Sequence, residues 1–381
     1  MSSDLDHRYM GRAIQLAKRG WYTTQPNPRV GCVLVKDGEI VGEGYHRRAG
    51  ELHAERNALA DAGEAAWGAT AYVTLEPCCH QGRTPPCTEG LIEAGVKRVV
   101  AAMTDPNPKV AGKGFEQLKQ AGIEVVSGVL ETQAAALNPG FIKRMRQGLP
   151  YVRCKMGMSL DGRTAMANGE SQWITSAESR VDVHKLRAAS NAILTGVGTL
   201  LADDPSMNVR ISHSELGIDE DLQIPGPVRV VLDPQLQTPA SARMLNLPGQ
   251  TLVVCSDDNP THGIALEAAG AQVVTVPAVE QGLDLHEVLQ FLADQEINEI
   301  LLESGATLAG AMLEQGLVDE LIIYQAPHLM GDSARGLFRL PGIQQMSQRL
   351  SLNITDVRQI GPDIRITATP RINEDKPRFR S

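Results

Sequence analysis

Three of the six cysteines in this 381-residue chain lie close together, in the stretch TLEPCCHQGRTPPC at residues 74–87. Cys78, Cys79 and Cys87 fall within ten positions, and His80 lies among them. Thiolate and imidazole are ligands that zinc commonly takes in proteins. In a reducing compartment, such a cluster indicates metal binding or catalysis more than disulfides.

A second group of reactive residues lies upstream in HAERNAL, where His53 and Glu55 are two positions apart. Zinc that keeps one open position needs three protein ligands, and zinc nucleobase deaminases supply them as one His and two Cys. In those enzymes a glutamate two residues after the His transfers protons without binding the metal. His-x-Glu followed by Glu-Pro-Cys at 76–78 matches that pattern.

The second sulfur ligand departs from the usual signature, because no cysteine stands three places after Cys78. Cys79 directly follows Cys78, and neighbouring residues rarely point at one ion. Eight residues, including a proline pair, separate Cys78 from Cys87 and can return Cys87 to the metal. The predicted set is His53, Cys78 and Cys87 as zinc ligands, Glu55 as general acid and base, and Cys79 off the metal.

Simpler interpretations exist for each residue alone. His53 is also typical of a helix cap or a core histidine, and Glu55 of a solvated helix face. A structural four-ligand zinc site that uses Cys79 or His80 as well is the main alternative. A structural site has no need of a carboxylate two places from a ligand, so the combined pattern favours catalysis.

The elements that must position these residues alternate between helix and strand. Residues 6–20 predict an amphipathic helix, with Asp6 as a candidate cap and Gly20 at its end. Residues 29–46 predict a hairpin that turns at Asp37-Gly38. A helix opening at His53 and further strands and helices follow. This alternation predicts an α/β domain with a largely parallel sheet covered on both faces.

A second α/β unit follows a junction at Gly-Leu-Pro, residues 148–150. We expect domains at 1–147 and 148–370, and a polar tail at 371–381. Two glycine-rich turns follow strands, one with Gly196 and Gly198 in ILTGVGTLLADDP, the other with Gly305 in ILLESGATLAGAML. Backbone N–H groups at such turns favour a phosphate, although neither turn has the three spaced glycines of the dinucleotide fingerprint.

Composition limits the class of protein. The net charge of -9 and the pI near 5.5 argue against a surface for nucleic acid. The N-terminal segment does not resemble a secretory signal, and no apolar run is long enough to span a bilayer. We therefore expect a cytoplasmic protein without a membrane partner.

Longer motifs resemble a known family. PNPRVGCVLV, GEGYHRRAGELHAE, TLEPCCHQGRTPPC and DPNPKVAGKG resemble the deaminase half of the bifunctional riboflavin-biosynthesis deaminase/reductase family. SLDGRTA, GESQWIT, LTGVGTLLADDP and ESGATLAGAML resemble its reductase half. The resemblance implies a cytidine-deaminase-like three-layer α/β/α domain followed by a dihydrofolate-reductase-like α/β domain. The family commonly has Ser where this chain has Cys79.

For the first domain, the resemblance implies zinc-dependent hydrolytic deamination of a diaminopyrimidinone that carries ribosylamine 5′-phosphate. Asn27, His46 and His80 match positions that line the substrate pocket. On their own, Asn27 is typical of a turn and His46 of an exposed hairpin end.

For the second domain, the resemblance implies reduction of the ribosyl side chain by NADPH. Arg187 and Arg210 suit the 5′-phosphate, because a guanidinium can bind phosphate through two parallel hydrogen bonds. The matched cofactor positions are Gly157, Trp173, Thr199, Asp203, Gly305, Ala306, Thr307, Leu308, Ala309, Gly310 and Ala311. The matched substrate positions are Ser171, Arg187, Met207, Arg210 and Glu303.

Two other functions compete with this interpretation. A deaminase of free cytosine, cytidine or tRNA adenine would not need the second domain, and the acidic balance disfavours the tRNA substrate. A zinc-stapled interaction module without turnover would not bind NADPH. Because enzymes of this kind commonly assemble, we also expect a homo-oligomer.

Overall fold

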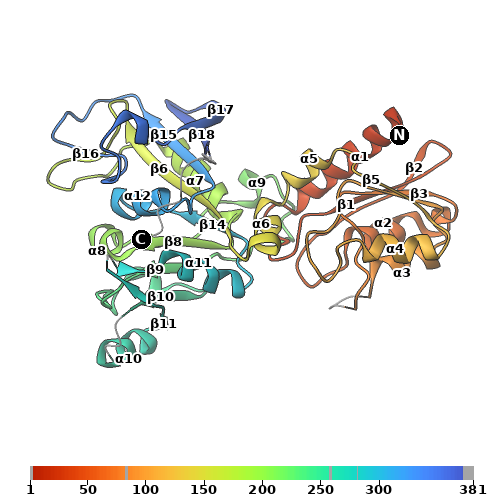
Figure 1. Ribbon diagram of the computed structural model, residues 1–381, viewed down its shortest axis with the longest axis horizontal. Coiled ribbons are helices and arrows are strands. Elements are labelled where there is room, and N and C mark those ends of the chain that lie inside the picture. Colours follow the sequence, from red (N-terminus) through yellow and green to blue (C-terminus); the bar gives the residue numbers. More distant parts are fainter. Residues whose placement is uncertain (1–2, 82–84, 257–259, 281, 372–381) are drawn as a thin grey trace. The chain divides into compact units, whose positions relative to one another are not determined.

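A computed structural model describes residues 3–81, 85–256, 260–280 and 282–371 (Figure 1). The chain divides into two compact units, one of residues 1–149 with 218–225, the other of 150–217 with 226–381. Most of the predicted polar tail, 372–381, lies outside the described residues. Within the described ranges, we find no helix with the length and apolar character needed to cross a bilayer.

The first unit is a three-layer α/β/α sandwich (Figure 1). Its five-stranded sheet has the order β2-β1-β3-β4-β5. Its elements are α1 (Asp4–Ala17), η1 (Lys18–Gly20), β1 (Gly31–Lys36), β2 (Glu39–Tyr45), α2 (Ala54–Ala62), η2 (Gly63–Ala66), β3 (Thr70–Val73), α3 (Cys87–Glu93), β4 (Arg98–Ala101), α4 (Lys113–Gln120), β5 (Glu124–Ser127), α5 (Glu131–Ala135) and α6 (Pro139–Gln147).

The start of α1 differs from the prediction. Ser3, not Asp6, is the N-cap: its hydroxyl accepts from the Asp6 N–H, and the Asp6 carboxylate accepts from the Ser3 N–H. This reciprocal pair is a capping box. The buried Asp6 carboxylate also accepts from Tyr72 and pairs with Arg98 at 2.8 Å, which ties α1 to β3 and β4.

The sheet of the first unit is mixed, so the prediction of a largely parallel sheet was wrong for this unit. β1 pairs antiparallel with both β2 and β3, whereas β3, β4 and β5 are parallel. The hairpin turn at Asp37-Gly38, which was predicted, reverses β2 relative to β1. The α2 crossover then places β3 parallel to β2 on the far side of β1, and therefore antiparallel to β1.

Helix α2 packs directly on the backbone of β2 because two strand positions lack side chains. A Cβ at Gly44 would lie 2.4 Å from the Ala54 carbonyl oxygen, and one at Gly42 would lie 2.5 Å from that of Ala58. This close approach fixes the first turn of α2 against the sheet.

The second unit contains a nine-stranded sheet of order β11-β10-β9-β8-β14-β6-β15-β18-β17. Every pair from β11 to β15 is parallel, and the last two pairs are antiparallel. The elements are β6 (Tyr151–Ser159), β7 (Arg163–Ala165), α7 (Ala177–Ala188), β8 (Ala192–Gly196), α8 (Val197–Asp203), α9 (His213–Leu216), β9 (Val228–Leu232), η3 (Arg243–Asn246), β10 (Thr251–Cys255), α10 (Pro260–Ala268), β11 (Gln272–Thr275), β12 (Ala278–Val279), β13 (Gly282–Leu283), α11 (Leu285–Asp294), β14 (Glu299–Leu302), α12 (Ala306–Glu314), β15 (Glu320–Ala326), β16 (Arg335–Gly336), η4 (Met346–Gln348), β17 (Leu352–Ile360) and β18 (Asp363–Pro370).

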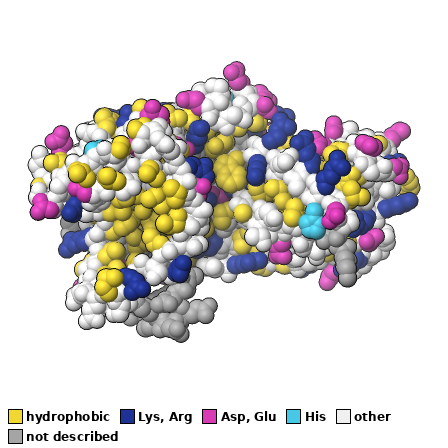
Figure 2. Space-filling model, turned by 90° about the horizontal axis from the view of Figure 1, so that it is seen from above, with side chains coloured by type: hydrophobic (Ala, Val, Ile, Leu, Met, Phe, Trp, Pro, Cys, Tyr) yellow, Lys and Arg dark blue, Asp and Glu magenta, His cyan; other side chains and the backbone are white. Residues whose placement is uncertain are grey.

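The C-terminal hairpin leaves apolar side chains in solvent. Strand β17 forms one edge of the sheet, and Ile354 and Val357 on it are 61% and 59% exposed. Hydrophobic side chains also gather on the face of this unit that Figure 2 presents.

Residues 218–225 return to the first unit. Asp221 pairs with Arg47 at 3.2 Å and Asp219 with Arg19 at 3.4 Å, all at exposed positions. Leu222, between these acidic residues and Pro225, is buried. The first unit is therefore built from two separate stretches of the chain.

Candidate active sites

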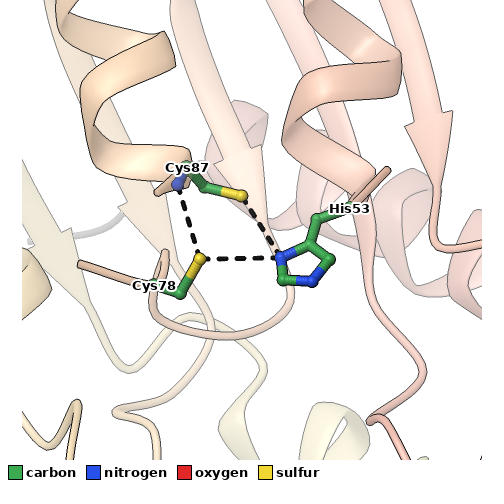
Figure 3. Close-up of side chains that lie close together, drawn as sticks. All are labelled: His53, Cys78 and Cys87. Carbon is green, nitrogen blue, oxygen red and sulfur yellow. Dashed lines mark hydrogen bonds between the residues drawn. The ribbon is translucent and has the colours of Figure 1, made fainter. Parts of the chain in front are cut away.

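Three elements converge on the predicted metal ligands. His53 is the N-cap residue of α2, but its side chain makes no capping hydrogen bond, so its ring is available for another partner. Cys78 follows β3, and Cys87 is the first residue of α3. Figure 3 shows the three side chains pointing toward one another.

The separations among these side chains fit a tetrahedral ion. His53 Nδ1 lies 3.5 Å from the Cys78 sulfur and 3.4 Å from the Cys87 sulfur. Zinc with bonds of about 2.0 Å to nitrogen and about 2.3 Å to sulfur separates such ligand atoms by about 3.5 Å. The Cys87 side chain first, and then His53 and the Cys87 N–H, outweigh the effect of burial and lower the pKa of Cys78 to about 4, which favours the thiolate that a metal binds.

Glu55 lies in the first turn of α2 and is buried. Burial raises the pKa of Glu55 to about 7, and the charge of Cys78 adds to the shift. A carboxyl group with a pKa near neutrality can both accept and return a proton.

Cys79 and His80 do not belong to the cluster of potential metal ligands, which among the described residues is His53, Cys78 and Cys87. Cys79 is half-buried and His80 is exposed. The structure therefore brings together the three predicted ligands without the two residues on which a four-ligand structural site would depend.

His46 and Asn27, two predicted pocket residues, lie beside the cluster. The His46 ring packs edge-on against the His53 ring, with centroids 5.2 Å apart. His46 Nδ1 lies 3.1 Å from the Leu52 carbonyl oxygen, so Nδ1 donates and Nε2 accepts from the Asn27 amide at 3.1 Å. Burial lowers the pKa of His46 to about 4, so this ring is neutral and not the exposed histidine that its place at a hairpin end suggested.

In the second unit, the two glycine-rich turns lie next to each other. Strands β8 and β14 are parallel neighbours, so their carboxyl ends meet at one edge of the sheet. The Gly305 N–H, at the N-cap of α12, donates to the Thr199 hydroxyl of α8 at 3.2 Å. Gly305 and Thr307 are exposed there, whereas Ala309 and Gly310 are buried. The other residues of the run, Ala306, Leu308 and Ala311, are half-buried.

A charged group lies beside these turns. Arg187 Nε and Nη2 donate to the two carboxylate oxygens of Glu303 at 2.6 and 3.0 Å. Lys155 Nζ lies 4.0 Å from the same carboxylate. Burial opposes ionisation of Glu303, but Arg187 and Lys155 outweigh it and lower the pKa of Glu303 to about 2.

The remaining predicted substrate residues differ in exposure. Arg210 is exposed, and its backbone N–H donates to His184 Nδ1 at 3.1 Å. Met207 is buried in the core with a φ of +44°, and Ser171 is half-buried. Met207 therefore packs in a hydrophobic core cluster, and no contact with a substrate follows from its position.

The remaining predicted cofactor residues lie on three different segments of the second unit. Trp173 is 70% exposed and lies under the Arg180 guanidinium, 4.5 Å from the ring centroid. Asp203, the last residue of α8, accepts from Gln172 at 3.5 Å. Gly157 lies on β6 opposite Tyr324.

Known proteins show the same order of domains. A family model of the RibD C-terminal domain matches residues 150–366, and a model of the cytidine and deoxycytidylate deaminase zinc-binding region matches residues 3–103. The riboflavin biosynthesis protein RibD of Escherichia coli (strain K12) is 52% identical over 94% of this chain and 98% of that protein. The chain belongs to the RibD family. It is a bifunctional deaminase and reductase of riboflavin biosynthesis, with a zinc-binding deaminase domain first and a reductase domain second.

Further relatives agree across the whole length. RibD of Haemophilus influenzae is 49% identical over 97% of this chain and 98% of that protein. Acinetobacter baumannii RibD, form 2, superposes with a TM-score of 0.88 at 48% identity and covers 97% of this chain and 100% of that one. A diaminohydroxyphosphoribosylaminopyrimidine deaminase/5-amino-6-(5-phosphoribosylamino)uracil reductase of Thermotoga maritima gives 0.82 at 32% identity, over 96% and 99% of the chains. The predicted fold class, a cytidine-deaminase-like domain followed by a reductase-like domain, is confirmed.

Sequence reasoning missed two ionisable residues near these sites, the buried Asp105 and the half-buried Lys155. Asp105 is buried near Cys78, and burial raises the pKa of Asp105 to about 7. Lys155 lies on β6, where residues 151, 153, 155 and 157 share one face of the strand. Charged residues at alternate positions of a central strand were the available signal for Lys155.

Proposed function

We propose that the first unit replaces an amino group of a diaminopyrimidinone ribosylamine 5′-phosphate by oxygen, with zinc held by His53, Cys78 and Cys87. The observation that carries this proposal is the separation of His53 Nδ1 from the two sulfurs, 3.5 and 3.4 Å, beside a buried carboxyl group. Bound zinc would supply the Lewis acidity that makes water nucleophilic at neutral pH.

In this proposal Glu55 moves the protons. Its carboxyl group takes one proton from the attacking water and gives it to the ring nitrogen, then takes the second proton from the added hydroxyl and gives it to the amine, which leaves as ammonia. The neutral His46, with its Nε2 turned to Asn27, orients the Asn27 amide at the side of the pocket. The Thermotoga maritima relative, which is named as a diaminohydroxyphosphoribosylaminopyrimidine deaminase, supports this class of substrate.

The second unit, in the same proposal, reduces the ribosyl side chain to ribityl with NADPH, which supplies the hydride. The N–H groups at the start of α12 and the exposed Trp173 ring fit a cofactor with phosphates and aromatic rings. Arg187 and Arg210 would bind the substrate phosphate. Lys155 is a candidate proton donor, because burial lowers its pKa while Glu303 opposes the shift.

Two measurements test the two halves. Glu55→Gln should keep zinc and abolish ammonia release, and release that survives the change would refute the deaminase assignment. Product masses after incubation with the diaminopyrimidinone ribosyl phosphate should show one amine exchanged for oxygen, and two added hydrogens only when NADPH is present. If the product gains two hydrogens with NADH but not with NADPH, then NADH is the cofactor.

Self-association and a cytoplasmic location belong to the same proposal. The exposed apolar residues of the edge strand β17 support self-association. Light scattering of the purified full chain would give its mass in solution, and a monomer at micromolar concentration would contradict a homo-oligomer.

A further inference from the structure

The carboxylate of Glu76, two residues before Cys78, is buried and accepts four backbone hydrogen bonds. Oε2 accepts from the N–H groups of Asp105 and Gly112 at 3.1 and 2.9 Å. Oε1 accepts from those of Gly114 and Phe115 at 2.9 and 3.3 Å. A carboxylate has about four acceptor positions, so this group is saturated by backbone donors.

Three of those donors belong to the amino end of α4. Gly112 is its N-cap residue, and Gly114 and Phe115 lie in its first turn. The first N–H groups of a helix lack partners within the helix, and a glycine N-cap has no side chain to supply one. Glu76 therefore caps α4 from a distant part of the chain, and its negative charge lies at the favourable end of the helix dipole.

Close packing joins the same two segments. A Cβ at Gly114 would lie 2.2 Å from the Pro77 carbonyl oxygen. The residue between Glu76 and Cys78 thus rests directly on the backbone of α4. On the other side, the Cys78 carbonyl accepts from the N–H and the hydroxyl of Thr88, both at 3.2 Å. Cys78 is therefore held between α4 and the start of α3.

We propose that Glu76 is a positioning residue for the metal centre, which fixes the Cys78 sulfur by anchoring its loop to α4. This inference rests on the proposed role of Cys78 as a zinc ligand. Glutamine at position 76 would keep one acceptor oxygen and turn an NH₂ group toward two N–H donors, which would then lack an acceptor. The loop must shift to relieve that conflict, and the sulfur moves with it.

The test compares zinc release from Glu76→Gln and from the unchanged full chain, with a colorimetric chelator in excess. We expect release to be about 10-fold to 100-fold faster in the variant, as for other residues that orient metal ligands. In the cobalt-substituted protein, the thiolate-to-cobalt absorption should weaken or shift. Reductase turnover, carried by the other unit, should stay unchanged.

Asp6→Asn provides a matched control. Asp6 is also a buried carboxylate that anchors a helix of this unit, but its partners are Ser3, Tyr72 and Arg98. This variant should lower the melting temperature and leave the cobalt spectrum and zinc release unchanged. A general loss of stability would therefore be told apart from a displaced ligand.

The outcomes distinguish a wrong ligand set from a wrong role for Glu76. If the unchanged chain shows no thiolate-to-cobalt absorption, the proposed ligand set fails. If the unchanged chain binds cobalt and Glu76→Gln has the same release rate and spectrum, the positioning role alone is overturned. Equal effects of Asp6→Asn and Glu76→Gln also overturn it. Should Glu76→Gln fail to fold, Glu76→Asp keeps the charge with a shorter reach and must still speed release several-fold.

Discussion

In the deaminase unit the proposed reactive groups are side chains from residues 53–87, whereas in the reductase unit the matched positions extend from residue 157 to 311. His53, Cys78 and Cys87 form a compact group at the ends of three elements. The reductase positions include the start of α12, where the Gly305 N–H donates to the Thr199 hydroxyl, and the ion pair between Arg187 and Glu303. A metal needs particular side-chain types, so its site can be read from composition. A phosphate can be bound by backbone N–H groups at the start of a helix, whatever the side chains are, so a phosphate site cannot be identified from residue types.

A substitution in one site should therefore reduce the activity of that site and leave the other activity unchanged. The largest expected effect is that of Cys87→Ser, which removes a proposed zinc ligand. This variant should lose its zinc, and its rate of ammonia release should fall at least about 1,000-fold. NADPH-dependent reduction of the already deaminated substrate should persist. Cys79→Ser is the control and should keep full zinc content in an assay by atomic absorption. Loss of zinc from Cys79→Ser would return Cys79 to the ligand set.

The next effect concerns the reductase site alone. Glu303→Gln leaves Arg187 and Lys155 without their common carboxylate and should lower reductase kcat/KM by up to about 100-fold, the size expected for loss of a hydrogen bond between charged groups at the site. Ammonia release should not change. Glu320→Gln is the control, because Glu320 pairs with Arg153 on the same strand as Lys155. If both variants lose reductase activity equally, the effect is one of folding.

A smaller effect tests stability in the deaminase unit. Asp6→Asn should lower the free energy of unfolding by about 3 kcal/mol at neutral pH, since Arg98 loses a buried partner. Arg98, opposed by burial, holds the pKa of Asp6 well below its ordinary value of 3.8. The stabilisation is therefore present above pH 3.8 and is lost as the pH falls toward the folded-state pKa. Urea unfolding at several pH values should show the difference between the two proteins shrinking in acid.

The smallest effect tests the backbone site. Thr199→Val removes the hydroxyl that accepts from the Gly305 N–H and should raise the KM for NADPH about fivefold, equivalent to about 1 kcal/mol. Thr355→Val, on the C-terminal hairpin, removes a comparable hydrogen bond to Thr367 and should leave this KM unchanged. An unchanged KM in Thr199→Val would show that the turn does not depend on this contact.

Sequence reasoning correctly placed together the three side chains of the candidate metal site, although their chemistry stays a prediction. The His-x-Glu and Glu-Pro-Cys motifs indicated the cluster of His53, Cys78 and Cys87. The Asp37-Gly38 dipeptide indicated the hairpin turn. Sequence reasoning failed where two choices were locally equivalent: Ser3 and Asp6 are both good N-caps, and the structure uses Ser3.

Long-range contacts were also beyond sequence reasoning. The Glu76 anchor depends on Gly112 and Gly114, whose approach to the loop only the folded chain reveals. The pairing of Arg187 with Glu303 joins residues 116 positions apart. Such contacts have no local signature, because each partner alone is typical of a solvated charge.

The return of residues 218–225 to the first unit limits how this enzyme can be divided. A gene fragment that stops at Leu149 would encode every proposed zinc ligand but would omit Leu222 and the acidic residues that pair with Arg19 and Arg47. To express the deaminase unit alone, residues 218–225 would therefore have to be joined to the fragment through a linker. A chimera of two RibD proteins would have to take residues 1–149 and 218–225 from the same parent.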